Sequence, residues 1–333
     1  MSGFEKHDHW REKSLLVFGV SDVSRGTHLE LYASSSSHAI ARQVFSGKEG
    51  RIANCDLFLY RRLLMWPDSD LTSLSEVDDV LTELRGKRWL FRGHSKQHRN
   101  LVPSIDRELQ NKPTLQKLAC ERRSIDLFRS TARFFADSGE QEALQNDLTA
   151  LMVLRHYGVP TRLLDWSLSP FVAAYFAVSD LDDEDGEIWC FDEPLYEEIG
   201  RQQWAKWPET TVSGDGRSFL ADLTAFLVNP PDWFVCFFYS QYAGFHRQKA
   251  QTGAFSMTAR FGVNHADAIA NLLQNNSKYH RYVVKRGLKR DLRDTLRKAH
   301  GIWRGSLYPD SAGAAETAKL EHFPRADKAR VAP

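Results

Sequence analysis

Residues 148–181 read LTALMVLRHYGVPTRLLDWSLSPFVAAYFAVSDL, and this stretch decides the fold of the chain. Its first part carries apolar residues at helical spacing, with Asp147 as the expected N-cap and Gly158 as the expected end of the helix. Its last part predicts a second helix, because Ser169 is a favourable N-cap and Pro170 suits the first helical position. We expect two apolar helices joined by a polar connector.

The connector between these helices, GVPTRLLDWSLS at 158–169, is both anchored and charged. Its leucines and tryptophan supply apolar anchors, whereas Arg162 and Asp165 form a charged pair that an ordinary loop does not require. A buried arginine needs a partner, so we expect Arg162 to pair with Asp165. Binding residues concentrate in connectors that a rigid scaffold positions. The sequence therefore places half of a functional site here.

The composition is that of an ordinary globular protein, with 333 residues of which 42% are hydrophobic. Lys and Arg number 44 against 43 Asp and Glu, and this balance argues against a protein that wraps nucleic acid. The 4 cysteines are scattered singly, which is typical of reduced cytosolic thiols. Neither a membrane span nor a signal peptide is apparent. We expect a cytoplasmic protein without a metal site or a membrane partner.

Three segments are expected along the chain. Residues 1–69 form a small N-terminal β-rich segment, residues 70–315 form the main domain, and residues 316–333 form a flexible tail. The strands expected in the first segment lie at 14–20, 27–33, 39–45 and 56–66.

The main domain is expected to be a mixed α+β fold, a split antiparallel β-sheet core flanked by helices. In chain order it is predicted to contain a helix at 73–84, a strand from 89, a long amphipathic helix at 115–136, the two helices of the opening stretch, an exposed acidic turn at 180–185, a strand at 185–192, a loop-rich stretch at 193–232, a buried strand at 232–240, a loop feeding a strand at 246–262, and a strand followed by a basic helix at 278–302.

Residues 89–91, Trp-Leu-Phe, predict the start of a buried strand that ends at Arg92 and Gly93. A strand that delivers an arginine at its end fixes the guanidinium for bidentate recognition of a phosphate. The alternative is a structural salt bridge from Arg92 to Asp165. Cationic residues beyond the strand fit either a phosphate patch or a solvated loop; they are His94, Lys96, His98 and Arg99.

Five blocks of this sequence resemble the FRG-domain family. They are FRG at 91–93, LVPSIDR at 101–107, LRHYGVPTRLLDWSLSPFVAAYFA at 154–177, QTGAFSM at 251–257 and LRDTLRKAHGIWRGSLYPD at 292–310. The resemblance covers residues 70–315 in the right order. The block HYGVPTRLLDW is specific enough to exclude chance, but the family implies no particular activity.

A weaker resemblance to arginine-first ADP-ribosyltransferases implies an activity. Those enzymes carry an aromatic–Arg pair on an early strand, a strand centred on serine before a helix, and a late Glu or Gln at the entrance to a strand. Phe91–Arg92, Trp166–Ser167 and Gln251 occur here in that order. The resemblance implies that NAD is the substrate and that the split sheet is of the ADP-ribosyltransferase type.

The same resemblance implies roles for these residues. Arg92 would neutralise the pyrophosphate of NAD, Ser167 would position a ribose or an acidic partner, and an aromatic ring would stack on nicotinamide. The late position is Gln251 and not a glutamate, so Asp165 is the nearest candidate carboxylate. The residues expected to contact NAD are Phe91, Arg92, Gly93, His94, His156, Tyr157, Thr161, Arg162, Trp166 and Ser167.

Three of these assignments have a structural alternative. His156 lies at the end of the first helix, where the helix dipole alone favours a cationic histidine. Tyr157 can either stack on a ligand or cap the core. Gln251 can either orient a ribose hydroxyl or satisfy the backbone of a turn.

Three functions remain open from the sequence. The first is an NAD-dependent ADP-ribosyltransferase that acts as a toxin or phage-defence effector, with a protein or nucleic-acid acceptor and a neutralising antitoxin or regulatory partner. The second is a nucleotide- or nucleic-acid-binding module, whose electrostatic footprint would be the basic residues at 94–99 and 285–297. The third is a hydrolase or nuclease that uses His156 and Asp165 as an acid–base pair.

Overall fold

The structure is a computed structural model that describes residues 15–22, 27–34, 66–98, 100–203, 235–239, 246–258, 260–274 and 276–322. The chain divides into two compact units, Met1–Tyr60 and Arg61–Pro333. In the first unit, β1 (Leu15–Asp22) pairs antiparallel with β2 (Thr27–Ser34), which confirms the strands predicted at 14–20 and 27–33. The strand predicted at 39–45 and nearly all of the one at 56–66 lie outside the described residues.

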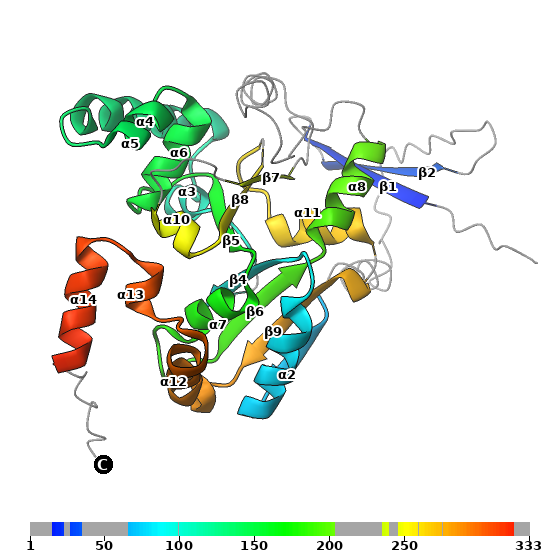
Figure 1. Ribbon diagram of the computed structural model, residues 1–333. Helices are drawn as coiled ribbons and strands as arrows, with labels where there is room; N and C mark the ends of the chain where they lie inside the picture. Colours follow the sequence, from blue (N-terminus) through cyan, green and yellow to red (C-terminus); the bar gives the residue numbers. More distant parts are fainter. Residues whose placement is uncertain are drawn as a thin grey trace, which may run out of the picture. The chain divides into compact units, whose positions relative to one another are not determined.

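The second unit is built on a mixed sheet whose seven described strands run in the order β3-β9-β6-β4-β5-β8-β7 (Figure 1). The strands are β3 (Asp68–Leu71), β4 (Leu90–His94), β5 (Leu163–Ser167), β6 (Gly186–Phe191), β7 (Val235–Tyr239), β8 (Gly253–Thr258) and β9 (Tyr279–Val284). The unit is α+β as predicted, but the expectation of a wholly antiparallel sheet is wrong at one edge, because β3 runs parallel to β9.

Strands β4 and β5 are joined by a single residue pair, Phe91 with Ser167. On either side of this junction the ladders are longer, since β4 pairs with β6 over five positions and β5 pairs with β8 over five positions. The sheet is therefore one continuous layer that nearly separates into two antiparallel blocks between β4 and β5. Backbone groups and side chains at this junction are available to line a cavity.

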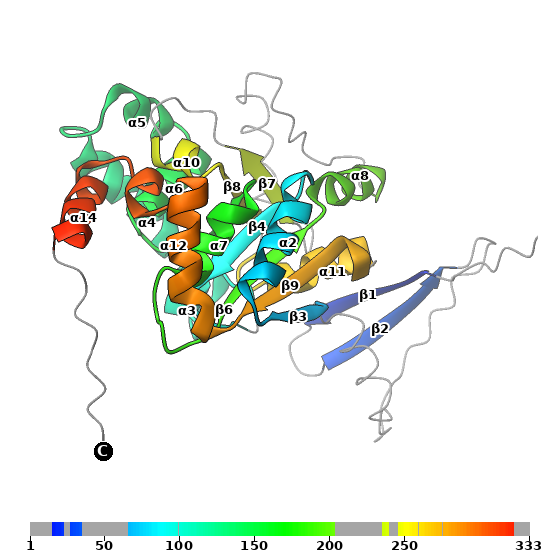
Figure 2. The same cartoon turned by 60° about the horizontal axis from the view of Figure 1, so that its bottom comes forward.

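Helices cover both faces of the sheet. They are α2 (Leu74–Arg85), α3 (Ser104–Glu108), α4 (Thr114–Ala132), α5 (Ser138–Ala143), α6 (Asp147–His156), α7 (Pro170–Val178), α8 (Glu193–Gln203), α10 (His246–Ala250), α11 (His265–Leu273), α12 (Lys289–His300), α13 (Arg304–Leu307) and α14 (Ser311–His322), with 3₁₀ turns η1 (Asn276–Lys278) and η2 (Arg286–Leu288). Figure 2 shows α2, α7 and α12 over one face of the central strands.

Alternation along β6 divides the core into two clusters. Ile188 and Cys190 pack with the apolar residues of α2, α7 and α12. Trp189 and Phe191 face the other way and pack with the apolar residues of α6 and α11. Successive side chains of a strand point to opposite faces, so a strand buried on both faces carries apolar residues at consecutive positions, as β6 does at 188–191 after the buried Glu187. This pattern makes β6 the centre of the fold.

The opening stretch folds into α6, β5 and α7. Helix α6 is capped by Asn146, whose side chain accepts the Leu148 N–H, and not by the predicted Asp147. The cap of α7 is confirmed, because Ser169 accepts the Val172 N–H and Pro170 is the first helical residue. The connector is more ordered than predicted, since its apolar anchors form strand β5.

Several other boundaries differ from prediction. Strand β4 continues through Arg92 to His94, because both residues are paired to β6. The stretch at 193–232, predicted to be loop-rich, begins with α8. Helix α14 extends to His322, inside the segment where a flexible tail is expected. Helix α2 is as predicted, with Ser73 and Glu76 forming a capping box.

Helix α7 lies directly on the backbones of β4 and β6 at two glycines. A Cβ atom on Gly93 would lie 1.8 Å from the carbonyl oxygen of Ala173, and one on Gly186 would lie 2.1 Å from that of Ala177. The close approach of backbone to backbone therefore requires glycine at both positions. Among the described helices, none is long and apolar enough to cross a bilayer.

We predict that Gly93→Ala destabilises the protein by about 1–3 kcal/mol, because the added methyl group forces α7 away from β4. Urea denaturation of the purified protein measures the change. Gly86→Ala is the matched control: a Cβ atom there meets nothing within 4 Å and the φ of −80° suits alanine. Equal denaturation midpoints for the two variants would contradict the close packing of α7.

Candidate functional site

A cavity of about 650 Å³ opens beside the junction of β4 and β5. Its walls come from β4, the end of α6, β5, α7, the turn between α10 and β8, and the segment that follows α13. Of the residues predicted from the sequence, it is lined by Phe91, Arg92, Gly93, His156, Tyr157, Asp165, Trp166, Ser167 and Gln251. The volume lies within the range of small-molecule sites.

The carboxylate of Asp165 lies between two guanidinium groups. Arg155 donates from Nε and Nη2 to Oδ2 of Asp165, at 2.9 and 2.6 Å. Nη1 of Arg92 lies 3.6 Å from the same oxygen and donates to the backbone carbonyl of Asp165. Burial raises the pKa of Asp165, but the charges of Arg155 and Arg92 outweigh it and lower the pKa overall. The structural alternative for Arg92, a salt bridge to Asp165, is therefore present in the structure.

Arg92 is also held from the opposite side by a buried chain. Its Nε donates to Nε2 of His94 at 2.8 Å, and Nδ1 of His94 lies 2.9 Å from Oε1 of Glu187. Because Nε2 accepts, the proton of the neutral imidazole is assigned to Nδ1, which donates to the carboxylate. Burial and the charge of Arg92 lower the pKa of His94 well below its ordinary value, so this histidine stays neutral.

His94 therefore contacts Arg92 and does not line the cavity. Burial and the charges of Arg155 and Arg107 together lower the pKa of Arg92 to about 10, although the charge of Asp165 opposes this shift. At neutral pH the guanidinium is still a cation. Its Nη2 takes no protein partner within the described ranges, which leaves N–H groups for a ligand oxygen.

The predicted pair of Arg162 with Asp165 is wrong. Arg162 is buried with Glu121 of α4, and its Nε and Nη2 donate to Oε2 of Glu121 at 2.8 and 2.5 Å. Thr161 is also fully buried beside it. Neither residue lines the cavity, so their predicted contact with NAD is not supported by their positions. Asp165 is not the partner of Arg162, because its carboxylate binds Arg155. Helix α4 supplies the carboxylate of Glu121 in its place.

Ser167, at the end of β5, is linked to Gln251, in the turn before β8. The hydroxyl of Ser167 donates to the backbone carbonyl of Gln251 at 2.8 Å and accepts the N–H of Ser169 at 3.0 Å. The side chain of Gln251 donates from Nε2 to the carbonyl of Leu307 at 3.1 Å. Its amide oxygen is left to accept a hydrogen bond, so Gln251 combines the predicted turn role with a position in the cavity wall.

Phe91 and Trp166, two of the aromatic residues predicted to contact NAD, are core residues. Phe91 is fully buried in the cluster around α7, and the indole N–H of Trp166 donates to Ser256 Oγ at 2.7 Å. More exposed aromatic rings come from other elements. Tyr157, which is 55% exposed, and the half-buried Phe176 and Tyr308 line the cavity.

His156 and Tyr157 both line the cavity at the end of α6. Burial and the charge of Arg247 lower the pKa of His156, whereas Glu140 and Asp310 oppose this shift. The hydroxyl of Tyr157 donates to Glu140 at 2.5 Å, which raises the pKa of Tyr157 to about 12. A neutral His156 can accept a proton, but the Asp165 expected beside it in a hydrolase is bound to two arginines.

Residues 87–186 match the FRG domain family. This confirms the resemblance for the part of the chain that holds β4, β5 and α7, while the wider range of 70–315 remains a prediction. Neither the curated proteins nor the solved structures include a match to the chain.

The matched FRG region supplies only part of the cavity. The rest comes from residues after 186. Gln251, Gly253, Ala254 and Phe255 belong to the block QTGAFSM, whereas Arg247, Gln248, Tyr308 and Asp310 were not among the predicted site residues. Arg247 donates to the carbonyl of His156 at 3.0 Å and lies 4.2 Å over the ring of Tyr308. Within the FRG region, Arg155 and Phe176 were also missed. Arg155 lies next to His156 in the stretch 148–181, so its position beside a predicted site residue could have identified it.

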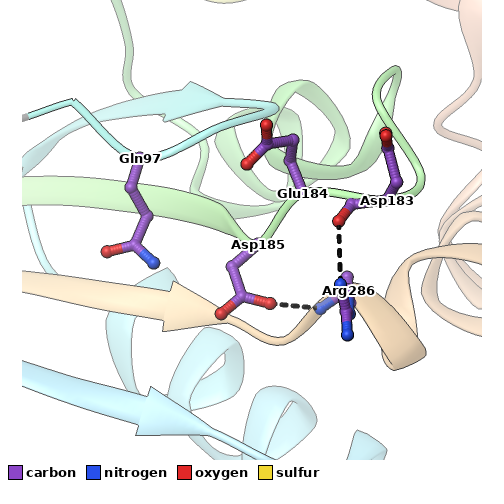
Figure 3. A pocket seen from close by; sticks show the side chains of 5 residues that line it. All are labelled: Gln97, Asp183, Glu184, Asp185 and Arg286. Atoms are coloured by element: carbon purple, nitrogen blue, oxygen red, sulfur yellow. Dashed lines mark hydrogen bonds between the residues drawn. The ribbon is translucent and has the colours of Figure 1, made fainter.

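A second, smaller cavity of about 300 Å³ lies beside the acidic turn (Figure 3). Its lining is Gln97, Asp183, Glu184, Asp185 and Arg286. The backbone N–H of Arg286 donates to Asp185, and its guanidinium donates to the carbonyl of Asp183 (Figure 3). Lys285 and Arg293 also pair with aspartates. Salt bridges thus neutralise these two cations of the basic stretch at 285–297, which reduces the positive charge of the expected nucleic-acid footprint.

We predict that Glu187→Gln gains stability relative to the wild type as the pH rises. Burial raises the pKa of Glu187 to about 7 from an ordinary 4.5. The contribution of the protonated carboxyl to the free energy of unfolding is therefore fully present below pH 4.5 and is lost as the pH approaches 7. Glutamine keeps an oxygen for His94 and does not titrate. The difference in unfolding free energy should rise by at most ~3 kcal/mol over this range.

Chemical denaturation at a series of pH values measures this difference. Above pH 7.5 the two proteins should run in parallel, which serves as the internal control. A difference that is constant across the acidic range would show that the Glu187 carboxyl is not held in its protonated form by burial.

Proposed function

We propose that this protein is an NAD-dependent ADP-ribosyltransferase. The observation that carries the proposal is that Arg92, Ser167 and Gln251, from three different strands or strand entrances, line one cavity. They meet where the sheet nearly separates, at the single pair between Phe91 and Ser167. The pairing of β4 with β5 and of β5 with β8 brings these residues together from distant parts of the chain.

The charge of the cavity suits a dinucleotide. Arg92, Arg155 and Arg247 line it, and guanidinium groups bind pyrophosphate oxygens in a fixed geometry. Aspartate pairing fixes Arg92 and Arg155 in place before a ligand arrives, which lowers the entropy lost on binding. The half-buried rings of Phe176 and Tyr308 offer flat apolar surfaces for a nicotinamide or adenine ring.

The polar groups at the junction suit a ribose. The amide oxygen of Gln251 can accept a hydrogen bond from a ribose hydroxyl, while its Nε2 stays bound to Leu307. Ser167 holds the backbone of Gln251 at the cavity wall. In this proposal Ser167 is a positioning residue and Gln251 contacts the substrate.

The acceptor in this proposal is a nucleophile on a protein or a nucleic acid. An enzyme that modifies such targets in its own cell would act as a toxin or a phage-defence effector. It would also need a neutralising or regulatory partner. The basic stretch at 285–297 is a weak candidate for acceptor binding, because two of its cations, Lys285 and Arg293, are paired with the acidic turn.

We predict that Arg92→Lys lowers the release of nicotinamide from NAD at least ~100-fold, because lysine cannot replace a guanidinium held by His94 and Asp165. Liquid chromatography of full-length protein incubated with NAD, with and without cell lysate or oligonucleotides as acceptor, measures the release. Arg293→Lys is the matched control, since Arg293 pairs with Asp182 away from the cavity.

Calorimetric titration with NAD separates the outcomes. Binding without any release of nicotinamide would favour a non-catalytic nucleotide-binding module. If the wild type neither binds NAD nor releases nicotinamide, the proposal is overturned. Equal activity of Arg92→Lys and Arg293→Lys would remove Arg92 from the site.

A further inference from the structure

We infer that Asp310 supplies the catalytic carboxylate that the strand residues of the site lack. This inference rests on the proposed function and adds to it a residue from the segment between α13 and α14. The residue lies outside the matched FRG region. The argument starts from the two acidic residues of the cavity wall.

Among the residues that line the cavity, Asp165 and Asp310 are the two carboxylates. Asp165 is unsuited to a second role, because its Oδ2 already takes two hydrogen bonds from Arg155 and lies 3.6 Å from Arg92. A carboxylate so neutralised does little to stabilise a developing cation. Gln251 carries no charge. Asp310 is therefore the acid that remains.

The segment that carries Asp310 is attached to the cavity wall at Leu307 and Tyr308 and is held internally by Arg304 and Gly313. Gln251 donates to the carbonyl of Leu307, and the ring of Tyr308 lies 4.2 Å from the guanidinium carbon of Arg247 and 4.9 Å from that of Arg304. At the start of α14, the N–H of Gly313 donates to Oδ1 of Asp310 at 2.7 Å.

Close packing at Gly313 keeps this turn in one shape. A Cβ atom there would lie 1.8 Å from the carbonyl oxygen of Tyr308. The backbone that carries Asp310 is thus packed against the first turn of α14 with no room for a side chain between them. A preorganised carboxylate needs such a support.

Asp310 also acts electrostatically on the residues at the end of α6. Its charge raises the pKa of His156 against burial and Arg247, and it contributes to the raised pKa of Tyr157 after Glu140 and Asp137. Asp310, His156 and Tyr157 all line the same cavity. Arg92 reaches the same cavity from β4.

The step assigned to Asp310 is balanced as follows. The bond between C1′ of the ribose and N1 of nicotinamide breaks, and its electron pair leaves with nicotinamide, which departs as a neutral molecule. Positive charge develops on C1′ and the ring oxygen, where the negative charge of Asp310 opposes it. An oxygen or nitrogen of the acceptor forms the new bond to C1′, and Asp310 takes the proton that the acceptor loses.

Asp310→Asn isolates the charge from the structure, because asparagine keeps an oxygen for the Gly313 N–H and is as good a cap as aspartate. We expect this variant to release nicotinamide from NAD about 100- to 1000-fold more slowly than the wild type. Its affinity for NAD, measured by calorimetry, should stay within about threefold, because the arginines that bind the pyrophosphate are unchanged.

Asp137→Asn is the matched control. Asp137 also accepts an N–H at the start of a helix, from Glu140 at 2.8 Å, but it does not line the cavity. Its activity and melting temperature should equal those of the wild type. Asp310→Glu, which restores the charge on a longer side chain, should recover part of the activity.

The outcomes separate the two proposals. If the wild type releases nicotinamide and Asp310→Asn releases it equally fast, the role of Asp310 is overturned and the proposed function stands. A wild type that binds no NAD and releases no nicotinamide would overturn both. Loss of activity in Asp310→Asn together with a melting temperature far below that of Asp137→Asn, without rescue by Asp310→Glu, would assign Asp310 a structural role only.

Discussion

The pairing of Asp165 with two arginines is the interaction on which the cavity depends. Without the carboxylate, Arg155 and Arg92 would be like charges held close together in a partly buried wall. With it, both guanidinium groups are fixed while N–H groups remain for a ligand. His94 and Glu187 hold Arg92 from behind, so its direction is set by partners on two sides. A cationic wall is thus built without a large stability penalty.

The sheet positions this wall. Its two blocks share only the pair of Phe91 and Ser167, and Arg92 and Ser167 lie at this junction. Helix α7 packs directly on β4 and β6 of one block, because glycines at 93 and 186 let its backbone touch these strands. The strands that carry Arg92 and Ser167 are thus ordered up to the cavity wall.

Local signals in the sequence were sufficient for the helices and for most strands. The cap at Ser169 and the capping box at Ser73 depend on neighbours within four residues, so the sequence alone reveals them. Partners that are distant in the chain could not be found in this way. Glu121 binds Arg162 from 41 residues away, and the nearer Asp165 was chosen wrongly because proximity in sequence was the available guide. Asp310 was missed for the same reason, since only the fold brings α13 beside the cavity.

The order of residues in the chain sets the order in which the parts of the cavity are synthesised, and Tyr308 and Asp310 come after the sheet. Every described strand of the sheet precedes these residues, so a ribosome completes the sheet before it adds them. On the proposed function, a nascent chain would hold the arginines of the cavity before it gained this acid. Catalytic competence would then follow the completion of the sheet, which would spare the ribosome and its messenger from modification by an enzyme whose sheet is still unfinished.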